Sequence, residues 1–219
     1  MQIGILEPKD FSEKAIAALN TIGNASFFKD NIKSFVSNKD ILFVRLDHYL
    51  DSNILGDAKS LKYLCTPTTG LNHIDLNFCQ NNDIEIISLK GETDFLNNIR
   101  ATPEHTFGLV LSLLRNYKKA FLNVNNKNWD RDLYKGLELY NSKVGIIGLG
   151  RIGKLLAKYF DAFDSQLSYY DNDESIKYKD LRRFSSLNEL IMYSDIILLC
   201  ASYSEKNNNM IDIQQIDLM

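Results

Sequence analysis

One stretch of the sequence, Val144-Gly145-Ile146-Ile147-Gly148-Leu149-Gly150-Arg151-Ile152-Gly153, decides the fold. Its first four residues form a short apolar run, which predicts a buried strand. The residues that follow at the spacing of one helix face are Ile152, Leu155, Leu156, Tyr159 and Phe160. A G-x-G-x-x-G pattern therefore stands between a strand and a helix, which is the context that a dinucleotide-binding loop requires.

Each of the three glycines has a physical role in such a loop. Gly148 permits a tight turn, Gly150 lets a pyrophosphate lie against the backbone, and Gly153 lets the helix pack closely on the strand. The helix N-terminus adds free N–H groups and a partial positive charge, which favour phosphate. The pattern predicts a dinucleotide site, and a glycine-rich turn without a ligand is the alternative.

A second expected strand, residues 166–170, leads into Asp171, which lies 18 residues after Gly153. A carboxylate about 20 residues beyond the glycines accepts hydrogen bonds from the adenosine ribose hydroxyls, and it repels a 2′-phosphate. The sequence therefore favours NAD over NADP as the cofactor. The acidic run from Asp171 to Glu174 does not fit a calcium loop, because the required glycine and closing glutamate are missing.

In the N-terminal half, short apolar runs alternate with amphipathic stretches. Strands are expected at residues 3–6, 41–44, 61–65 and 84–89. This alternation indicates an α/β fold with a parallel sheet covered on both faces. A long helix is expected over residues 102–119, with Thr102 as its N-cap and Pro103 in its first turn. We expect the domain change near residue 105, which gives domains 1–105 and 106–219.

Composition narrows the class of protein. With 45% hydrophobic residues, 24% charged residues and a formal net charge of −3, the chain is typical of a globular protein and offers no basic surface for nucleic acid. Its three widely spaced cysteines fit neither a disulfide framework nor a zinc site, so no metal is expected. We see no signal peptide and no apolar run of bilayer length, and we expect a cytoplasmic protein without a membrane partner.

At several further points the chain resembles the D-isomer-specific 2-hydroxyacid dehydrogenases. The matching segments follow the family's order and are residues 41–45, 68–75, 101–106, Trp129 with 136–139, and 194–199. The resemblance implies a flavodoxin-like substrate domain followed by an incomplete Rossmann dinucleotide-binding domain with a parallel sheet. It also implies a homodimeric, NAD-dependent oxidoreductase that acts on the CH–OH group of a D-2-hydroxy acid or on the matching 2-oxo acid.

The resemblance also assigns expected roles to individual residues. The backbone N–H groups of Thr69 and Gly70 would bind the substrate carboxylate, and Arg45 would hold the distal part of the substrate. Around the cofactor, Thr102 would lie near the nicotinamide, Arg151 and Ile152 would cover the pyrophosphate, and Cys200, Ala201 and Ser202 would wall the adenine.

Two positions depart from the family's pattern. Asn72 stands where aspartate is common, which leaves the hydrogen bonding of the substrate loop open. Ser202 stands where proline is common, which should loosen the adenine wall without removing it. Plainer interpretations also stay open: Arg45 could be a surface ion-pair partner, and residues 68–70 could be an ordinary turn.

The three histidines are not expected to be catalytic. His48 and His73 have the character of surface or structural histidines. His105 follows Glu104 directly, but adjacent residues on a helix do not face each other, so they do not form an acid–base pair.

The chemistry of the family needs residues that we do not expect in this chain. An arginine polarises the substrate carbonyl, and a histidine whose pKa is raised by a glutamate moves the proton. The family's order places all three after Met219. Only three of the six strands of a complete dinucleotide fold are recognisable, at residues 144–147, 167–170 and 196–199. We therefore expect a chain that is truncated at its C-terminus, contains no catalytic residue and has no turnover of its own.

Two other functions remain open. The chain could be a non-catalytic NAD-binding or regulatory protein derived from the same family. It could also belong to another NAD enzyme, such as a hydrolase that uses NAD as a redox cofactor, although the loop at residues 68–75 disfavours this.

Overall fold

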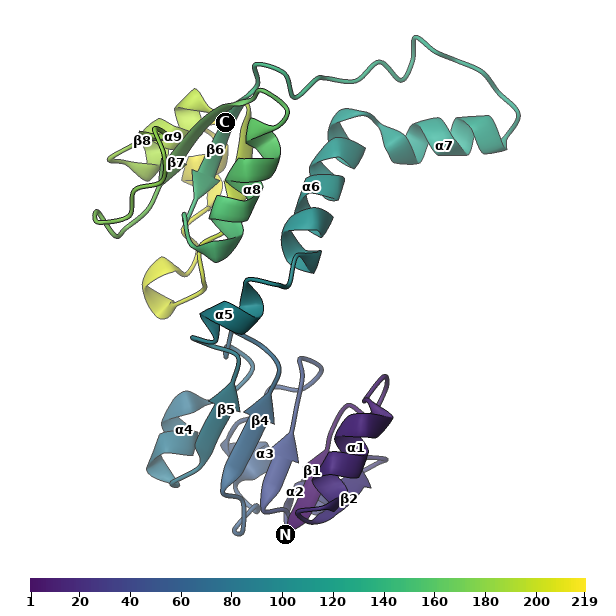
Figure 1. The fold of residues 1–219 in the computed structure, drawn as a ribbon, viewed down its shortest axis with the longest axis vertical. Helices are drawn as coiled ribbons and strands as arrows, with labels where there is room; N and C mark the ends of the chain where they lie inside the picture. Colours follow the sequence, from purple (N-terminus) through teal and green to yellow (C-terminus); the bar gives the residue numbers. More distant parts are fainter. The chain divides into compact units, whose positions relative to one another are not determined.

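The computed structural model describes residues 1–219, which form two compact units, Met1–Leu96 and Asn97–Met219. Each unit has a parallel β-sheet with helices packed against it (Figure 1). The expected α/β class with parallel sheets is thereby confirmed. The units divide between Leu96 and Asn97, ahead of the long helix, whereas the sequence placed the change inside that helix.

The first unit holds five parallel strands in the spatial order β2-β1-β3-β4-β5, which is the order of flavodoxin-like folds. The strands are β1 (Gln2–Ile5), β2 (Asn24–Phe27), β3 (Ile41–Phe43), β4 (Tyr63–Thr66) and β5 (Glu85–Ser88). The helices are α1 (Glu13–Asn20), α2 (Ile32–Val36), α3 (Ser52–Leu55), α4 (Leu76–Asn81) and α5 (Thr93–Leu96).

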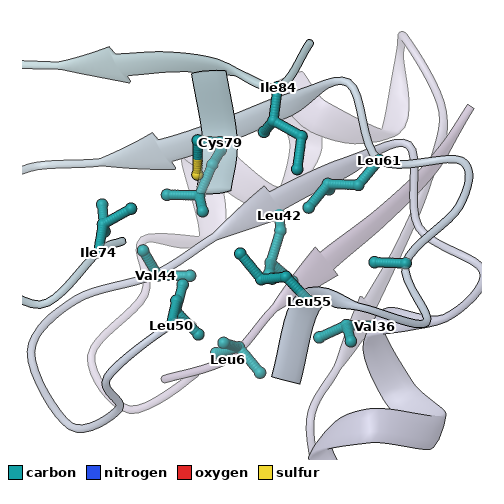
Figure 2. Close-up of a cluster of buried hydrophobic side chains, with 12 residues drawn as sticks. Leu6, Val36, Leu42, Val44, Leu50, Leu55, Leu61, Ile74, Cys79 and Ile84 are labelled. Carbon is teal, nitrogen blue, oxygen red and sulfur yellow. The ribbon is translucent and has the colours of Figure 1, made fainter. Parts of the chain in front are cut away.

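Strand β3 shows why this sheet can be buried on both faces. On one face, Leu42 packs in the main core of the unit, together with Leu6, Val36, Leu50, Leu55, Leu61, Ile74, Cys79 and Ile84 (Figure 2). On the other face, Ile41 packs with Ile3 and Cys65. Successive strand residues point to opposite faces, so a doubly covered strand has to be apolar at every position.

The edge strand β2 was not expected from the sequence. Its residues, Asn24 to Phe27, carry little apolar character, and none of them is buried. Its place is set by backbone pairing with β1, from Gln2 opposite Asn24 to Ile5 opposite Phe27. Because an edge strand can keep its side chains half exposed, the apolar pattern that reveals a central strand is missing.

The second unit holds four parallel strands in the order β8-β7-β6-β9. They are β6 (Lys143–Ile147), β7 (Gln166–Tyr170), β8 (Arg182–Arg183) and β9 (Ile196–Leu199). The helices are α6 (Ala101–Leu114), α7 (Tyr117–Asn125), α8 (Arg151–Asp161), α9 (Leu187–Tyr193) and α10 (Ile213–Ile216), with a short 3-10 turn at Glu205–Asn207. The two-residue strand β8 is too short and too polar to have been recognised from the sequence. None of the helices in either unit has the length and apolar character needed to cross a membrane.

The single helix expected over residues 102–119 is in fact two helices. Helix α6 begins after Arg100, so Thr102 lies inside its first turn and is not the N-cap; its carbonyl accepts a hydrogen bond from Thr106 Oγ1 at 2.9 Å. The chain then breaks at Asn116, whose φ of 53° is left-handed. Asparagine tolerates this conformation better than most residues, so α6 ends there and α7 begins.

Helices α6 and α8 cover one face of the second sheet. Ile146 packs there with Leu156 and Phe160 of α8, and the Phe107 ring of α6 meets Phe160 edge-on with the ring centroids 5.0 Å apart. Ile147, the next residue of β6, points to the opposite face. The cluster on that face contains Leu190 of α9. The burial of β6 on both faces thus fixes the end of the strand, where the glycine loop leads into α8.

Candidate functional site

The glycine loop between β6 and α8 makes two backbone approaches that only glycine allows. Gly148 has a φ of +88°, and a Cβ there would lie 2.6 Å from the backbone nitrogen of Ala201. A Cβ on Gly153 would collide with the carbonyl oxygen of Gly148. These two glycines therefore shape the turn and let α8 pack against it, as the sequence predicted.

Gly150 differs from the other two glycines because it faces open space. It caps the N-terminus of α8, and no atom lies within 4 Å of the position that its Cβ would take. A side chain at this position would occupy the space in front of the helix N-terminus. Free backbone N–H groups and an open approach are what a pyrophosphate needs, so the loop fits the phosphate part of a dinucleotide.

Six of the predicted cofactor residues line one cavity of about 320 Å³ at the carboxyl end of the second sheet. They are Gly148, Gly150, Asp171, Cys200, Ala201 and Ser202, and the wall is completed by residues that include Tyr170, Ile176 and Met210. The volume falls in the range of small-molecule sites, about 300–1,000 Å³. The carboxyl ends of parallel strands beside a glycine-rich turn are where open α/β sheets bind ligands.

Asp171 has a structural role that the sequence did not reveal. One of its carboxylate oxygens, Oδ2, accepts a hydrogen bond from the backbone N–H of Leu149 at 2.7 Å. The other, Oδ1, accepts from the N–H of Asp173 at 3.0 Å. The carboxylate thus ties the end of β7 to the glycine loop. Because each carboxylate oxygen can accept a second hydrogen bond, Asp171 can still receive ribose hydroxyls.

Cys200 contributes a neutral wall to this cavity. Burial raises the pKa of its thiol to about 11, so the thiol stays protonated at neutral pH. An uncharged, polarisable thiol behaves as a small apolar group, which suits a surface against a planar base.

The other four predicted cofactor residues, which are Gly153, Ile152, Arg151 and Thr102, do not line this cavity. Ile152 packs against the core of the second unit, and Arg151 Nη1 donates a hydrogen bond to the carbonyl of Ile99 at 3.2 Å. Thr102 is exposed in the first turn of α6. Their expected roles stay predictions. Nowhere in the chain do three His, Cys, Asp or Glu side chains gather in a way that could hold a metal ion.

In the first unit, the predicted substrate loop follows β4 and presents unused backbone donors. Thr68 Oγ1 donates a hydrogen bond to the Gly70 carbonyl at 2.7 Å and contacts Thr66 Oγ1 at 3.0 Å. The backbone N–H groups of Thr69 and Gly70 donate to no acceptor within the chain. Both residues are exposed. Two adjacent free N–H groups can bind a carboxylate, because backbone donors that face water are open to an anionic ligand.

Arg45 lies next to a second cavity, of about 360 Å³, which is also lined by Lys9, Phe11 and Phe43. Its guanidinium Nη1 donates to the Lys9 carbonyl at 3.2 Å and forms no ion pair within 4.0 Å. The interpretation of Arg45 as a surface ion-pair partner therefore finds no partner in the structure. Its positive charge remains available beside the cavity.

Glu7 is a buried carboxylate that sequence reasoning missed. It is only 7% exposed, and its side chain accepts hydrogen bonds from the backbone N–H groups of Arg45 at 2.8 Å and Asp47 at 3.3 Å. It therefore fixes the backbone that carries Arg45. The available signal was its position directly after the buried strand run that ends at Leu6.

His73 is buried within the substrate loop, which agrees with its expected structural character. Its Nε2 lies 3.4 Å from Thr66 Oγ1, and its buried Nδ1 has no hydrogen-bond partner. Burial lowers the pKa of His73, and the negative charge of Glu7 opposes this in smaller part. The neutral ring therefore supports the threonines that shape the loop.

Comparison with known proteins gives a consistent result over the whole chain. The protein-family model described as "D-isomer specific 2-hydroxyacid dehydrogenase, catalytic domain" matches residues 9–153. The family model described as "D-isomer specific 2-hydroxyacid dehydrogenase, NAD binding domain" matches residues 107–219. Among curated proteins, D-3-phosphoglycerate dehydrogenase of Methanocaldococcus jannaschii is 27% identical over 99% of this chain and 42% of its own length. A putative 2-hydroxyacid dehydrogenase of Staphylococcus haemolyticus is 28% identical over 90% of this chain and 62% of its own length.

Solved structures agree with these sequence matches. A NAD-dependent formate dehydrogenase from Staphylococcus aureus, in complex with NAD, has a TM-score of 0.88 and 25% identity, and the match covers all of this chain and 70% of that one. A D-lactate dehydrogenase from Aquifex aeolicus, complexed with NAD and lactic acid, has a TM-score of 0.84 and 25% identity over all of this chain and 66% of that one. The chain thus spans about two-fifths to three-fifths of the length of the curated relatives described above.

The buried His73 predicts a pH dependence of stability. Its pKa is lowered in the folded chain, so as the pH falls below the ordinary value of 6.5 the unfolded chain takes up a proton that the folded chain resists. We expect the free energy of unfolding to fall between pH 7 and pH 5, by at most about 1.4 kcal/mol per pH unit from this group. Urea denaturation at a series of pH values measures this.

The His73→Gln variant should show a flatter pH profile than the wild-type chain. His48→Gln is the matched control, because it removes the other histidine of the first unit, which packs edge-on to Phe28 and not against Thr66. Equal slopes for the wild-type chain and His73→Gln would show that His73 is not the titrating group.

Proposed function

Since this chain belongs to the D-isomer-specific 2-hydroxyacid dehydrogenase family, we propose that it supplies the substrate domain and the NAD site of an oxidoreductase acting on a D-2-hydroxy acid or the matching 2-oxo acid. The observation that carries this proposal is the single cavity lined by the glycine loop, Asp171 and the segment after β9. Its shape and its donors and acceptors suit the adenosine and pyrophosphate parts of NAD, and the family's NAD binding domain is matched over the same residues.

Each wall of the cavity has a proposed task in holding NAD. The Gly150 backbone and the N-terminus of α8 receive the pyrophosphate. Asp171 accepts hydrogen bonds from the adenosine ribose, and Cys200, Ala201 and Ser202 form the adenine wall. The proposal also gives Arg151 and Ile152 a place over the pyrophosphate and Thr102 a place near the nicotinamide. When bound, the nicotinamide supplies the hydride acceptor or donor.

We propose that the substrate domain binds the acid mainly through the negative charge of its carboxylate. The free N–H groups of Thr69 and Gly70 bind the carboxylate, and the two side chains beneath them, Thr68 and His73, keep the loop in shape. Arg45 holds the distal part of the substrate, from a backbone that Glu7 fixes. This division assigns binding to the 219 residues and leaves proton transfer to groups outside them.

One prediction from the proposed function concerns the choice of cofactor. Asp171→Asn removes the negative charge but keeps an oxygen that can accept from Leu149 N–H, so the loop should persist. We expect weaker NAD binding, with the preference for NAD over NADP reduced by about tenfold or more, because a charged hydrogen bond to the ribose is lost and the repulsion of the 2′-phosphate disappears. Calorimetric titration with NAD and NADP measures both dissociation constants.

Asp173→Asn is the control for this experiment, because Asp173 neighbours Asp171 but does not line the cavity. It should leave the preference unchanged. An Asp171→Asn variant that discriminates between NAD and NADP as well as the wild-type chain does would refute the ribose-binding role.

Another prediction concerns turnover. We propose that the catalytic arginine, glutamate and histidine are not among these 219 residues, and the cavity at the glycine loop is lined by none of the three histidines. The chain should therefore bind NAD without producing NADH from a panel of D-2-hydroxy acids, followed by absorbance at the nicotinamide band. NADH formation that depends on both enzyme and acid would contradict this.

We also propose that the chain forms a homodimer through α6, α7 and the connection between α7 and β6, which is residues 126–142. Large apolar side chains of this region are strongly exposed, among them Leu113 at 78%, Phe121 at 62% and Trp129 at 85%. Figure 1 shows α7 and this connection extending from the second unit. An apolar surface of this kind on a folded chain indicates a protein–protein contact.

The dimer can be tested with one charge substitution. Phe121→Glu should shift the chain toward monomer in sedimentation velocity, because a carboxylate buried in the contact lacks a partner. Ile22→Glu is the control, since Ile22 is also exposed, at 51%, but lies in the first unit. A wild-type chain that is monomeric at tens of micromolar, or a Phe121→Glu variant that is still dimeric, would contradict the proposal.

A further inference from the structure

We propose that Arg183 is a positioning residue for the ribose-binding carboxylate, acting on NAD affinity through the backbone of Asp171. The inference rests on the proposed NAD site and goes beyond it, because Arg183 does not line the cavity. It lies on β8, where it pairs with Tyr169 of β7, two residues before Asp171.

The contact between the two residues is direct. Arg183 Nη2 donates a hydrogen bond to the carbonyl oxygen of Asp171 at 3.0 Å. The side chain of Asp171 in turn accepts from Leu149 N–H at 2.7 Å. A continuous chain of hydrogen bonds therefore runs from β8 through the end of β7 to the glycine loop. Asp171 is held at its backbone by one residue and at its carboxylate by another.

The Arg183 side chain is partly buried. Its Nε is buried and has no hydrogen-bond partner. A buried donor without a partner costs free energy. The hydrogen bond from Nη2 to the Asp171 carbonyl is the favourable interaction that the side chain makes in return. Solvent screens a hydrogen bond in a partly buried site less than one on the surface. The hydrogen bond from Arg183 to the Asp171 carbonyl is therefore stronger than an exposed one would be.

The same guanidinium acts on the turn that follows Asp171. The pKa of Asp173 lies below its usual value, mainly because Ser175 donates hydrogen bonds to it and in smaller part because of the positive charge of Arg183. The turn over residues 171–173 therefore has a fixed backbone and a compensating charge on one side. A hydrogen bond to a ribose hydroxyl is directional, so the carboxylate has to be held in one orientation to bind it well.

Arg182 offers a matched control on the same strand. Neighbouring strand residues point to opposite faces, and the Arg182 guanidinium stacks over the rings of Phe184 at 4.3 Å and Tyr193 at 4.7 Å. It has the same charge and size as Arg183 and makes no contact with Asp171.

The test is a set of NAD titrations with the full 219-residue chain. Arg183→Met should weaken NAD binding by about fivefold to tenfold, the loss expected for one ordinary hydrogen bond, and Arg182→Met should change it by less than about twofold. In an Asp171→Ala background, Arg183→Met should add less than about twofold, because residues that act as one unit are not additive. An analogue of NAD whose adenosine ribose lacks both the 2′- and the 3′-hydroxyl should likewise bind Arg183→Met and the wild-type chain almost equally.

The outcomes separate this inference from the proposed function. A folded wild-type chain that does not bind NAD overturns the proposed site itself. Wild-type binding with Arg183→Met no weaker than Arg182→Met overturns only the role of Arg183. A loss that persists undiminished in the Asp171→Ala background, or with the analogue that lacks both ribose hydroxyls, shows a general structural effect and also overturns it. If circular dichroism shows that Arg183→Met does not fold, Arg183→Gln carries the same comparison.

Discussion

The hydrogen bond from Leu149 N–H to the Asp171 carboxylate joins the two strand ends on which the candidate site depends. Gly148 can adopt its positive φ and approach Ala201 only because it has no side chain, and the loop that results would be free to move without a partner. Asp171 supplies that partner from the neighbouring strand. The start of α8, the end of β7 and the segment after β9 are thereby held around one cavity.

In the first unit, too, a carboxylate binds backbone N–H groups of a neighbouring segment. Glu7 lies two residues after the end of β1 and accepts hydrogen bonds from backbone N–H groups beyond β3, as Asp171 follows β7 and accepts from the loop beyond β6. In both units a carboxylate at the carboxyl end of one parallel strand fixes the backbone that leaves its neighbour. Such ends are where parallel sheets place their sites, and their irregular backbone needs partners that no strand provides.

Local pattern was sufficient to predict the glycine loop, Asp171, the apolar strands and, through them, the family resemblance and NAD as cofactor, both of which the comparisons confirm. It failed where tertiary contacts decide the structure. Strands β2 and β8 lack an apolar pattern, and the break at Asn116 interrupts a stretch whose apolar spacing is continuous. The partners of Glu7 and Arg183 come from neighbouring strands, so no spacing along the chain could reveal them.

The most direct measurement of the central claim is an amide NMR titration of the chain with NAD. The account predicts saturable changes that are largest at Leu149, Gly150, Asp171 and Ala201, where the glycine loop, the strand end and the adenine wall meet. A folded chain whose amides do not respond to NAD would contradict it. So would a saturable response centred elsewhere, such as the groove lined by Asn116, Leu122 and Leu133.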